Sequence, residues 1–253
     1  MKEQHTFYFP NAAHADMLPE EEAKHAVRAL RMSKGDTFRL LDGKGMVYEA
    51  VVEETTNKHC RYTVTTVIHQ QKWWHGWLHM AIAPTKHIER TELFVEKAIE
   101  MGVDEITFLR GRFSERTTIR MDRIEKIIIA AMKQSRNAYM PVLHDMTSVE
   151  HFLQQQAPEK RESTQNERLY IAHCYDEVPR IHLQQELIQH PKTERVTMMI
   201  GPEGDFSIDE VRTATTTGAL SVTLGENRFR TETAAMVALM TMHFCQRQYA
   251  YKG

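Results

Sequence analysis

The stretch MMIGPEGDFSIDE, residues 198–210, ends an apolar run and begins a helical pattern on either side of one glycine-rich turn. The residues ERVTMMI (194–200) are β-branched at their start and apolar at their end, which predicts a short buried strand. Ser207 and Glu210 have the spacing of a capping box, the signal that begins a helix. The stretch therefore predicts a strand, a tight turn and a helix in direct succession.

The same succession follows once more towards the C-terminus. SVTLG (221–225) predicts a strand, ENRFR (226–230) a loop, and TETAAMVALMTMHFCQRQY (231–249) a helix. Because ligands of open α/β sheets bind outside the carboxyl ends of the strands, two consecutive glycine-bearing loops predict a ligand crevice. The segment GPEG alone is equally compatible with an ordinary tight turn. Between Ala234 and Phe244 the helix is apolar nearly all round, so we expect other elements, and in part another subunit, to cover it.

Residues 71–253 alternate between strand-like and helical patterns, which predicts an α/β domain. The predicted strands upstream of the quoted stretch span 78–84, 105–109 and 169–173, the predicted helices span 88–102 and 121–141, and a polar loop is expected at 154–167. Residues 1–70 predict a separate, smaller β-rich domain. It contains a short helix at 19–30, a hairpin around Asp-Gly-Lys-Gly at 37–54, and a further strand at 61–70.

Composition narrows the class of protein. Charged residues make up 26% of the 253 residues with a formal net charge of -2. No segment approaches the roughly 18 consecutive apolar residues of a membrane span, and the N-terminus lacks an apolar signal segment, so we expect a soluble cytoplasmic protein. The three cysteines are far apart, and His75 and His79 lack a third ligand nearby, so we expect no disulfide and no metal site. Neither a dinucleotide fingerprint nor a P-loop motif is present.

GPEGDFSIDEV (201–211) and LGENRFRTETAAMVAL (224–239), in this order, resemble the two signature loops of SPOUT methyltransferases, specifically the bacterial 16S ribosomal RNA uridine-N3 methyltransferases. EKAIEMGVDEITFL (96–109) and MKQSRNAYMP (132–141) resemble that family's KATELGV and EQSGR segments. HAVRALRMSKGD (25–36) and the hairpin after it resemble its PUA-like RNA-binding module. The resemblance covers nearly the whole chain.

The resemblance implies a fold and an activity. The fold is α/β, with a C-terminal SPOUT domain (71–253) that contains a deep trefoil knot and a small N-terminal β-barrel PUA-like domain (1–70). The activity is S-adenosylmethionine-dependent methylation of N3 of a specific uridine in 16S ribosomal RNA of the small subunit. The implied assembly is a homodimer.

The resemblance also implies the site residues. Those expected around the cofactor are His173, Ile200, Gly201, Pro202, Glu203, Gly204, Leu224, Gly225, Phe229 and Arg230. Because a uracil imide must lose its N3 proton, we expect Arg230 to stabilise the developing anion and Glu203 or Glu232 to take the proton. The sequence does not choose between the two acids, and Glu232 could instead serve only the helix N-terminus.

RNA binding requires cations, which occur in two regions of the sequence. Those expected to bind RNA are Arg28, Arg31, Lys34, Arg110, Arg112, Arg116, Arg120 and Arg136. Two departures from the family pattern concern substrate contacts: Asn227 stands where arginine is common, and Arg136-Asn137 stands where Gly-Arg is common.

Two alternative functions stay open at this point. One is a catalytically inactive, ribosome-binding RNA module, although the intact GPEG and RTETA segments argue against it. The other is a SPOUT enzyme that methylates a ribose 2′-hydroxyl or a tRNA base.

Overall fold

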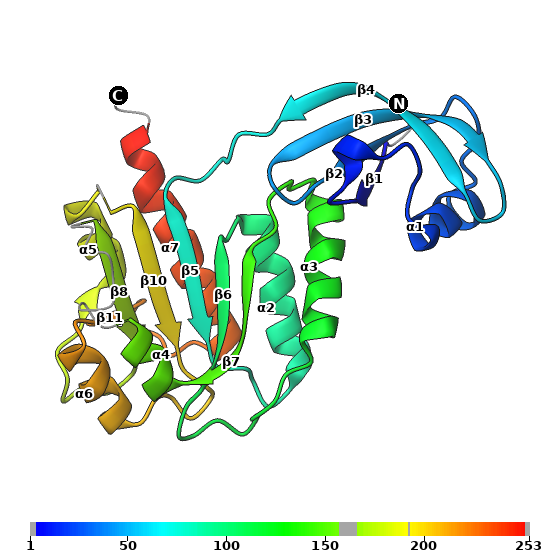
Figure 1. Ribbon diagram of the computed structural model, residues 1–253. Coiled ribbons are helices and arrows are strands. Elements are labelled where there is room, and N and C mark those ends of the chain that lie inside the picture. The colour runs from blue at the N-terminus through cyan, green and yellow to red at the C-terminus, as the bar shows by residue number, and fades with distance from the viewer. Residues whose placement is uncertain (1–3, 157–165, 192, 251–253) are drawn as a thin grey trace. The chain divides into compact units, whose positions relative to one another are not determined.

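The computed structural model describes residues 4–156, 166–191 and 193–250, the side chains of 246–250 excepted. The chain forms two compact units (Figure 1). The first contains the residues up to Lys72 together with 128–140, and the second contains 73–127 together with the residues from Pro141 onward. Most of the loop expected at 154–167 lies outside the described residues.

The first unit is built on a four-stranded sheet in the order β1-β2-β3-β4. Its strands are β1 (His5–Tyr8), β2 (Thr37–Leu41), β3 (Met46–Thr55) and β4 (Cys60–His69). β1 pairs with β2 in parallel, whereas β2 with β3 and β3 with β4 are antiparallel pairs. Between β1 and β2 the chain forms η1 (Ala12–His14), α1 (Glu20–Lys24) and η2 (His25–Ala29).

The predicted Asp-Gly-Lys-Gly hairpin joins β2 to β3. Asp42 Oδ1 accepts hydrogen bonds from the backbone N–H groups of Lys44 (2.7 Å) and Met46 (3.0 Å), which closes the turn. Behind the sheet, the buried ring of Phe38 meets Phe7 and Tyr62 edge to face at centroid distances of 5.4 and 5.6 Å. The first unit therefore has an apolar core of its own.

The end of α3 (Met121–Ser135) and the residues after it pack with the first unit. The side-chain amide of Gln70 donates to the carbonyl of Arg136 (2.9 Å) and accepts from the N–H of Ala138 (2.7 Å). Lys133 forms an ion pair with Glu22 at 2.9 Å. These contacts explain why 128–140 belong to the first unit.

The second unit contains a seven-stranded sheet in the order β7-β6-β5-β10-β8-β11-β9, in which every pair is parallel. Its strands are β5 (Trp77–Ile82), β6 (Glu105–Arg110), β7 (Val142–Ser148), β8 (Glu167–Ala172), β9 (Ile181–His182), β10 (Arg195–Ile200) and β11 (Leu220–Thr223). Ile200 of β10 lies in register with Ile82 of β5 and Ala172 of β8. The loops that follow these three central strands therefore begin at the same level.

Helices cover both faces of this sheet (Figure 1). They are α2 (Ile88–Met101), α4 (Val149–Gln155), α5 (Leu183–Gln189), α6 (Ile208–Thr216) and α7 (Thr231–Ala250). On one face, Phe152 of α4 and Val211 of α6 share a core with Ala81 and Met199. On the other, α7 packs against α2, α5, β5 and β10. Burial on both sides explains why the central strands β5, β6 and β10 are buried along nearly their whole length rather than at alternate residues.

The structure confirms the predicted hairpin, the strands β4, β5, β6, β8, β10 and β11, and the helices α2, α6 and α7. The helix expected at 121–141 stops earlier, at Ser135, because Arg136 adopts a left-handed φ of 59°. The helix expected at 19–30 is α1 followed by the π-helical turn η2. The elements β1, β7, α4, β9 and α5 were not predicted from the sequence, since they are short or, in the case of β7, lie at the polar edge of the sheet.

Candidate functional site

Loops from three parts of the chain meet the carboxyl ends of β8, β10 and β11. We call this region the carboxyl-end site and define it by residues 173–175, 200–205 and 224–232. α7 begins at the same end of the sheet, because it directly follows the loop after β11 (Figure 1). Every cofactor and catalytic residue expected from the sequence lies in these three segments.

The loop after β10 is a stiff turn that only glycine fits at its first position. Gly201 is buried, and a Cβ atom there would lie 2.9 Å from the backbone nitrogen of Phe206. Asp205 has a left-handed φ of 68°, and its N–H donates to the carbonyl of Pro202 at 2.9 Å. Its Oδ2 atom accepts from the N–H of Cys174 at 2.8 Å, which ties this turn to the loop after β8. Sequence reasoning missed Asp205, although its place directly after Gly204 was visible.

His173, at the start of the loop after β8, is a buried histidine with one ring nitrogen left over. Its Nδ1 atom accepts from the N–H of Tyr175 (3.2 Å), so the neutral ring carries its hydrogen on Nε2. Nε2 is buried and has no hydrogen-bond partner among the described residues. Burial lowers the pKa of His173 below its ordinary value; nearby Asp205 opposes this shift, and Arg180 adds to it. The site thus contains a neutral, unpartnered N–H donor.

The loop after β11 brings bare backbone and a buried acid to the site. Gly225 has a φ of 151°, and a Cβ atom there would meet no atom closer than Phe229 Cε2 at 3.9 Å. Arg230 is exposed, and its carbonyl accepts from the N–H of Ala234 (2.8 Å) in the first turn of α7. Glu232 is only 7% exposed, and its Oε2 atom has no hydrogen-bond partner among the described residues. The helix N-terminus beside it favours a negative charge.

The two acids that the sequence left as alternatives have different surroundings. Glu203 is exposed, and its Oε1 atom accepts from the backbone N–H of Lys86 at 2.9 Å. Glu203 therefore already has a structural contact, whereas the buried Glu232 has one carboxylate oxygen that accepts no hydrogen bond from the described residues. This difference in burial was not visible in the sequence.

The expected RNA-binding cations fall into two sets. Arg28, Arg31, Lys34 and Arg136 belong to the first unit and are all exposed, whereas Arg110, Arg112, Arg116 and Arg120 belong to the second. The first unit has a groove whose lining includes the two sequence neighbours of Arg31, Leu30 and Met32. Its lining residues are Gln4, His5, Leu30, Met32, Gly35, Asp36 and Thr37.

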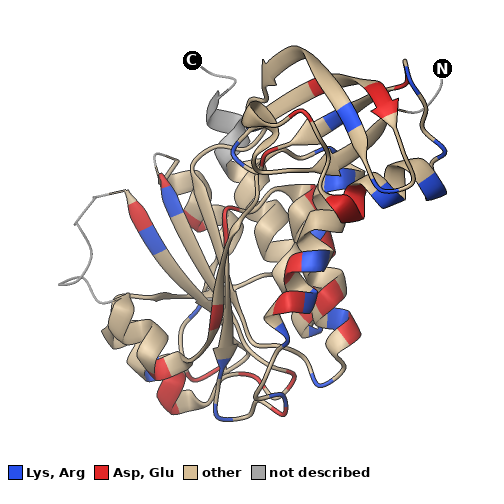
Figure 2. Ribbon diagram, turned by 45° about the vertical axis from the view of Figure 1, so that its right-hand side comes forward, with Lys and Arg blue, Asp and Glu red and all other residues tan. Residues whose placement is uncertain are grey.

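In the second unit the cations differ in how far they are already engaged. Arg116 donates to the carbonyls of Thr85 (3.0 Å) and Lys86 (2.8 Å), so it has a structural role in holding these loops together. Arg120 forms an ion pair with Asp122 at 2.8 Å. α3 mixes positive and negative residues along its surface, while lysine and arginine also occur in the loops at the carboxyl ends of the strands (Figure 2).

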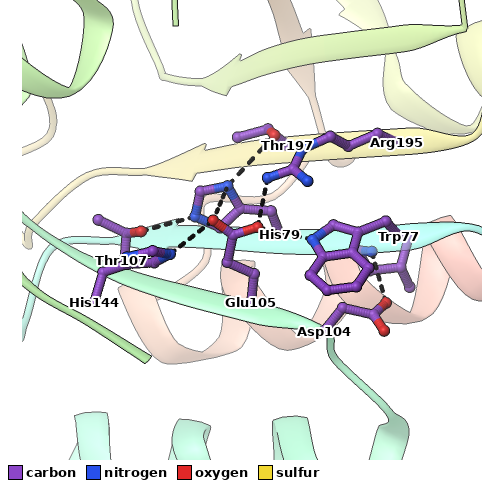
Figure 3. Close-up of polar contacts among 9 residues, drawn as sticks. Trp77, His79, Asp104, Glu105, Thr107, His144, Arg195 and Thr197 are labelled. Atoms are coloured by element: carbon purple, nitrogen blue, oxygen red, sulfur yellow. Dashed lines mark hydrogen bonds and ion pairs between the residues drawn. The ribbon is translucent and has the colours of Figure 1, made fainter. Parts of the chain in front are cut away.

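A second polar cluster lies at the opposite, amino ends of the strands (Figure 3). This amino-end cluster consists of Trp77, His79, Glu105, Thr107, His144, Arg195 and Thr197. Its centre is Glu105, which is 8% exposed. Glu105 accepts from Trp77 Nε1 at 2.7 Å and from His144 Nε2 at 2.8 Å, and it forms an ion pair with Arg195. His79 Nε2 lies 2.8 Å from Thr107 Oγ1.

The electrostatics of Glu105 follow from these contacts. Burial acts to raise the pKa of its carboxyl, but the charges of His79 and Arg195 and the hydrogen bonds from Trp77 and His144 outweigh burial and hold the pKa below its ordinary value. This cluster was not predicted from the sequence, because its members come from four separate strands.

Across the described residues, no three or more His, Cys, Asp and Glu side chains are placed to hold a metal ion together. Within the same residues, no helix combines the length and the apolar composition needed to cross a lipid bilayer.

Comparisons with known proteins agree with this fold. Residues 73–243 match the family described as RNA methyltransferase domain, and residues 18–64 match the RNA methyltransferase PUA domain. The crystal structure of a probable rRNA-methyltransferase from Porphyromonas gingivalis is 38% identical, with a TM-score of 0.84 over 97% of this chain and 99% of that chain. A Legionella pneumophila protein solved with bound SAM is 25% identical, with a TM-score of 0.75 over 95% and 97% of the two chains.

A curated relative gives the same result at the level of sequence. The Ribosomal RNA small subunit methyltransferase E of Mycobacterium bovis is 26% identical over 242 residues, which cover 91% of this chain and 86% of the relative. The expectation of a parallel α/β domain preceded by a PUA-like module is confirmed, whereas the trefoil knot stays a prediction. Since the match to the catalytic domain alone spans more than half of the sequence, this chain belongs to the RNA methyltransferase domain family.

Proposed function

We propose that this protein transfers a methyl group from S-adenosylmethionine to N3 of a uridine in 16S ribosomal RNA of the small subunit. Family membership supports RNA methylation. The name of the Mycobacterium bovis relative supports small-subunit ribosomal RNA as the substrate, and the Legionella pneumophila structure supports the cofactor. The resemblance of LGENRFRTETAAMVAL to the uridine-N3 enzymes supports N3 as the target atom.

The observation that carries this proposal is the pair of unpartnered polar atoms at the carboxyl-end site. His173 Nε2–H is a buried donor and Glu232 Oε2 a buried acceptor, and neither has a partner among the described residues. Leaving such groups unpaired costs roughly 1–3 kcal/mol each, a cost that a ligand can offset. Gly225 adds room for a flat ligand to approach its backbone closely, since a Cβ atom there would meet no atom nearer than 3.9 Å.

These residues fit S-adenosylmethionine. The cofactor would supply a methyl group bound to a positively charged sulfur. The charge makes the methyl carbon electrophilic. Apolar contacts would come from Ile200, Leu224 and Phe229, and the backbone of 201–204 and Gly225 would form the walls. His173 would donate from Nε2, and the remaining residues expected to line the pocket are Pro202, Glu203 and Arg230.

We assign the proton transfer to Glu232. Methylation of N3 requires the uracil to lose its N3 proton, and a positioned carboxylate within hydrogen-bond reach can accept it. Glu232 has an oxygen without a partner in the described part of the chain, whereas Glu203 already accepts from the backbone N–H of Lys86. Arg230 is exposed and would place its guanidinium beside the uracil oxygens, where negative charge develops.

The proposal also covers the roles of the two domains and the oligomeric state of the protein. Residues 1–70 would bind RNA through Arg28, Arg31 and Lys34, and residues 71–253 would carry the reaction. A homodimer is supported by α7, an apolar helix on which Phe244 is 61% exposed in the single chain.

The first experiment is calorimetry of S-adenosylmethionine binding to the natural protein and to a Gly201→Trp variant. We expect binding by the natural protein and none by the variant, because even a Cβ atom at position 201 would meet the Phe206 backbone. Circular dichroism and light scattering establish that the variant is folded. A Gly204→Ser variant is the milder companion, since the Cβ at that position meets the Phe113 side chain instead.

The second experiment measures N3-methyluridine in 16S ribosomal RNA from a strain that lacks the gene. Its disappearance, with restoration by the natural gene and not by a Glu232→Gln variant, is the expected result. If S-adenosylmethionine binds but a ribose 2′-O-methyl or a tRNA modification disappears instead, the uridine-N3 assignment is wrong. If the folded natural protein binds no cofactor, the inactive RNA-binding alternative replaces the proposal.

A further inference from the structure

The loop after β6 carries an aromatic residue at the tip of a tight turn. Ser114 closes the turn with its N–H on the carbonyl of Gly111 (3.2 Å) and its Oγ atom on the N–H of Gly111 (3.0 Å). Phe113 is a central residue of this turn and is 46% exposed. Such positions favour glycine, asparagine, aspartate or serine. A single exposed apolar side chain is common on proteins, so its surroundings decide whether Phe113 has a role.

Phe113 is fixed at the edge of the carboxyl-end site. A Cβ atom on Gly204 would lie only 3.0 Å from Phe113 Cβ, so the base of this side chain packs directly on the turn after β10. The N–H of Arg112 donates to Glu210 Oε1 at 2.9 Å, and Glu210 in turn caps α6 through Ser207. The turn is therefore anchored on both sides of Phe113.

The next residues along the chain hold the same loop to the end of β5. Arg116 donates to the carbonyls of Thr85 and Lys86, and the Lys86 ammonium pairs with Glu115 at 2.8 Å. These bonds leave the loop little freedom. A side chain on a fixed backbone loses less conformational entropy when a ligand stacks on it than one on a mobile loop. The anchored loop therefore favours a binding role for Phe113.

Two arginines come just before Phe113 in the chain, and neither charge is neutralised by another described residue. Arg110 and Arg112 are exposed, and in the described part of the chain neither guanidinium has an ion pair or a hydrogen bond. By contrast, Arg116 and Glu115 of the same loop are engaged with Thr85 and Lys86. Residues 110–113 therefore combine one exposed aromatic ring with two cations that have no partner among the described residues, the combination that binds single-stranded nucleic acid.

We propose that Phe113 is a stacking platform for an unpaired nucleobase of the RNA substrate, while Arg110 and Arg112 contact the phosphates on either side. This inference rests on the proposed function. N3 lies on the Watson–Crick edge of uracil, so the target base must be unpaired when it reacts, and unpaired bases stack on aromatic side chains. Phe113 would hold such a base at the entrance to the site rather than take part in the reaction.

The test measures the affinity of the full-length protein for a short, fluorescein-labelled oligouridine by fluorescence anisotropy. We expect Phe113→Ala to weaken binding about tenfold, because stacking on one aromatic side chain contributes roughly that factor. Phe113→Trp restores the aromatic face and is expected to bind as well as the natural protein. Ile188→Ala is the matched control, since Ile188 is 49% exposed on α5, away from this loop.

The salt dependence separates the ring from its flanking cations. Arg112→Gln removes one phosphate contact and is expected to reduce the slope of log affinity against log salt by about 0.7. Phe113→Ala is expected to leave that slope unchanged, because no phosphate contact is lost. Calorimetry with S-adenosylmethionine is run on the same proteins, and Phe113→Ala is expected to bind the cofactor normally.

Three results would overturn the inference. One is normal oligouridine binding by Phe113→Ala. Another is a change in the oligomeric state of that variant by light scattering, which would make Phe113 a contact between two copies of the chain. The third is a natural protein that binds S-adenosylmethionine but no oligouridine, since stacking does not depend on base sequence. That result leaves the cofactor proposal intact, whereas absent cofactor binding alone counts only against the proposed function.

Discussion

Two buried glutamates lie at opposite ends of the same parallel sheet, and their surroundings differ in kind. Glu105, at the amino ends, is bound by Trp77, His144 and Arg195. Glu232, at the carboxyl ends, is 7% exposed and has an oxygen without a partner among the described residues. A buried carboxylate with several donors stabilises the fold that holds it, whereas one without a donor costs stability. The amino-end cluster is therefore satisfied within the fold, whereas the carboxyl-end site keeps a buried polar atom without a partner among the described residues.

Two buried histidines repeat the comparison. His79 has Thr107 2.8 Å from one ring nitrogen and Glu105 3.7 Å from the other. His173 has its Nδ1 satisfied by the backbone of Tyr175 and its Nε2 unsatisfied within the described chain. The same residue type therefore closes a network at one end of the sheet and offers a donor at the other.

The largest expected effect is on catalysis, from Glu232→Gln. This substitution keeps the shape of the side chain and removes its ability to accept a proton, so we expect the methylation rate to fall by roughly 10²–10⁴. The free energy of unfolding is expected to change by less than about 1 kcal/mol, because no donor loses a partner. Single-turnover methylation of small ribosomal subunits and urea unfolding provide the two measurements. A rate within a few-fold of the natural protein would return Glu203 to consideration as the base.

The same substitution at the other end, Glu105→Gln, is expected to have the opposite profile. Glutamine keeps one acceptor oxygen, but it removes the charge of a buried ion pair and the second acceptor, which costs roughly 2–4 kcal/mol, so the free energy of unfolding should fall by about that amount. Affinity for S-adenosylmethionine, measured by calorimetry below the unfolding transition, should be unchanged. Stability equal to that of the natural protein would show that the amino-end cluster contributes nothing net, and the comparison would then fail.

The sequence predicts what is local and misses what depends on strand order. The capping box of Ser207 and Glu210 and the glycine turn at 201–204 depend on residues a few positions apart, and both are present as expected. The amino-end cluster joins residues near 77, 105, 144 and 195, which meet only because the sheet order places β10 beside β5 and β6 beside β7. That order is a tertiary property without a local signal.

The candidate site shows the same limit at the level of single residues. Motif resemblance brought Glu203, Arg230 and Glu232 forward together, but only the fold shows that Glu203 is exposed and Glu232 buried. In the same way, the arginines at 110–120 look alike in sequence. In the structure, Arg116 donates to two backbone carbonyls, whereas Arg112 forms no ion pair within the described chain.

A smaller effect is expected from removing the unpartnered donor at the carboxyl-end site. His173→Phe keeps an aromatic ring and deletes the Nε2–H, together with the Nδ1 acceptor of the Tyr175 N–H. We expect S-adenosylmethionine affinity to fall by roughly tenfold, the value of the one hydrogen bond that Nε2 would give the cofactor. His144→Phe is the matched control in the amino-end cluster and should leave cofactor affinity unchanged. Calorimetry measures the cofactor affinity of both variants. Equal affinity of the natural protein and His173→Phe would show that His173 does not bind the cofactor.

The smallest expected effect is a dependence of stability on acid, and it arises from Glu105. Because the pKa of Glu105 is held below its ordinary value in the folded protein, its ionised form contributes stability above the pKa of the unfolded chain, near 4.3. That contribution is lost as the pH falls from there through the lower folded pKa, since the unfolded state binds the proton first. The free energy of unfolding of the natural protein, measured with urea, should therefore fall more steeply below about pH 5 than that of Glu105→Gln. Glu232→Gln should follow the natural protein over the same range, because the loss belongs to the amino-end carboxylate. Parallel curves for the natural protein and Glu105→Gln would mean that Glu105 does not stabilise the fold through its charge, and the contrast between the two ends would then rest on hydrogen bonds alone.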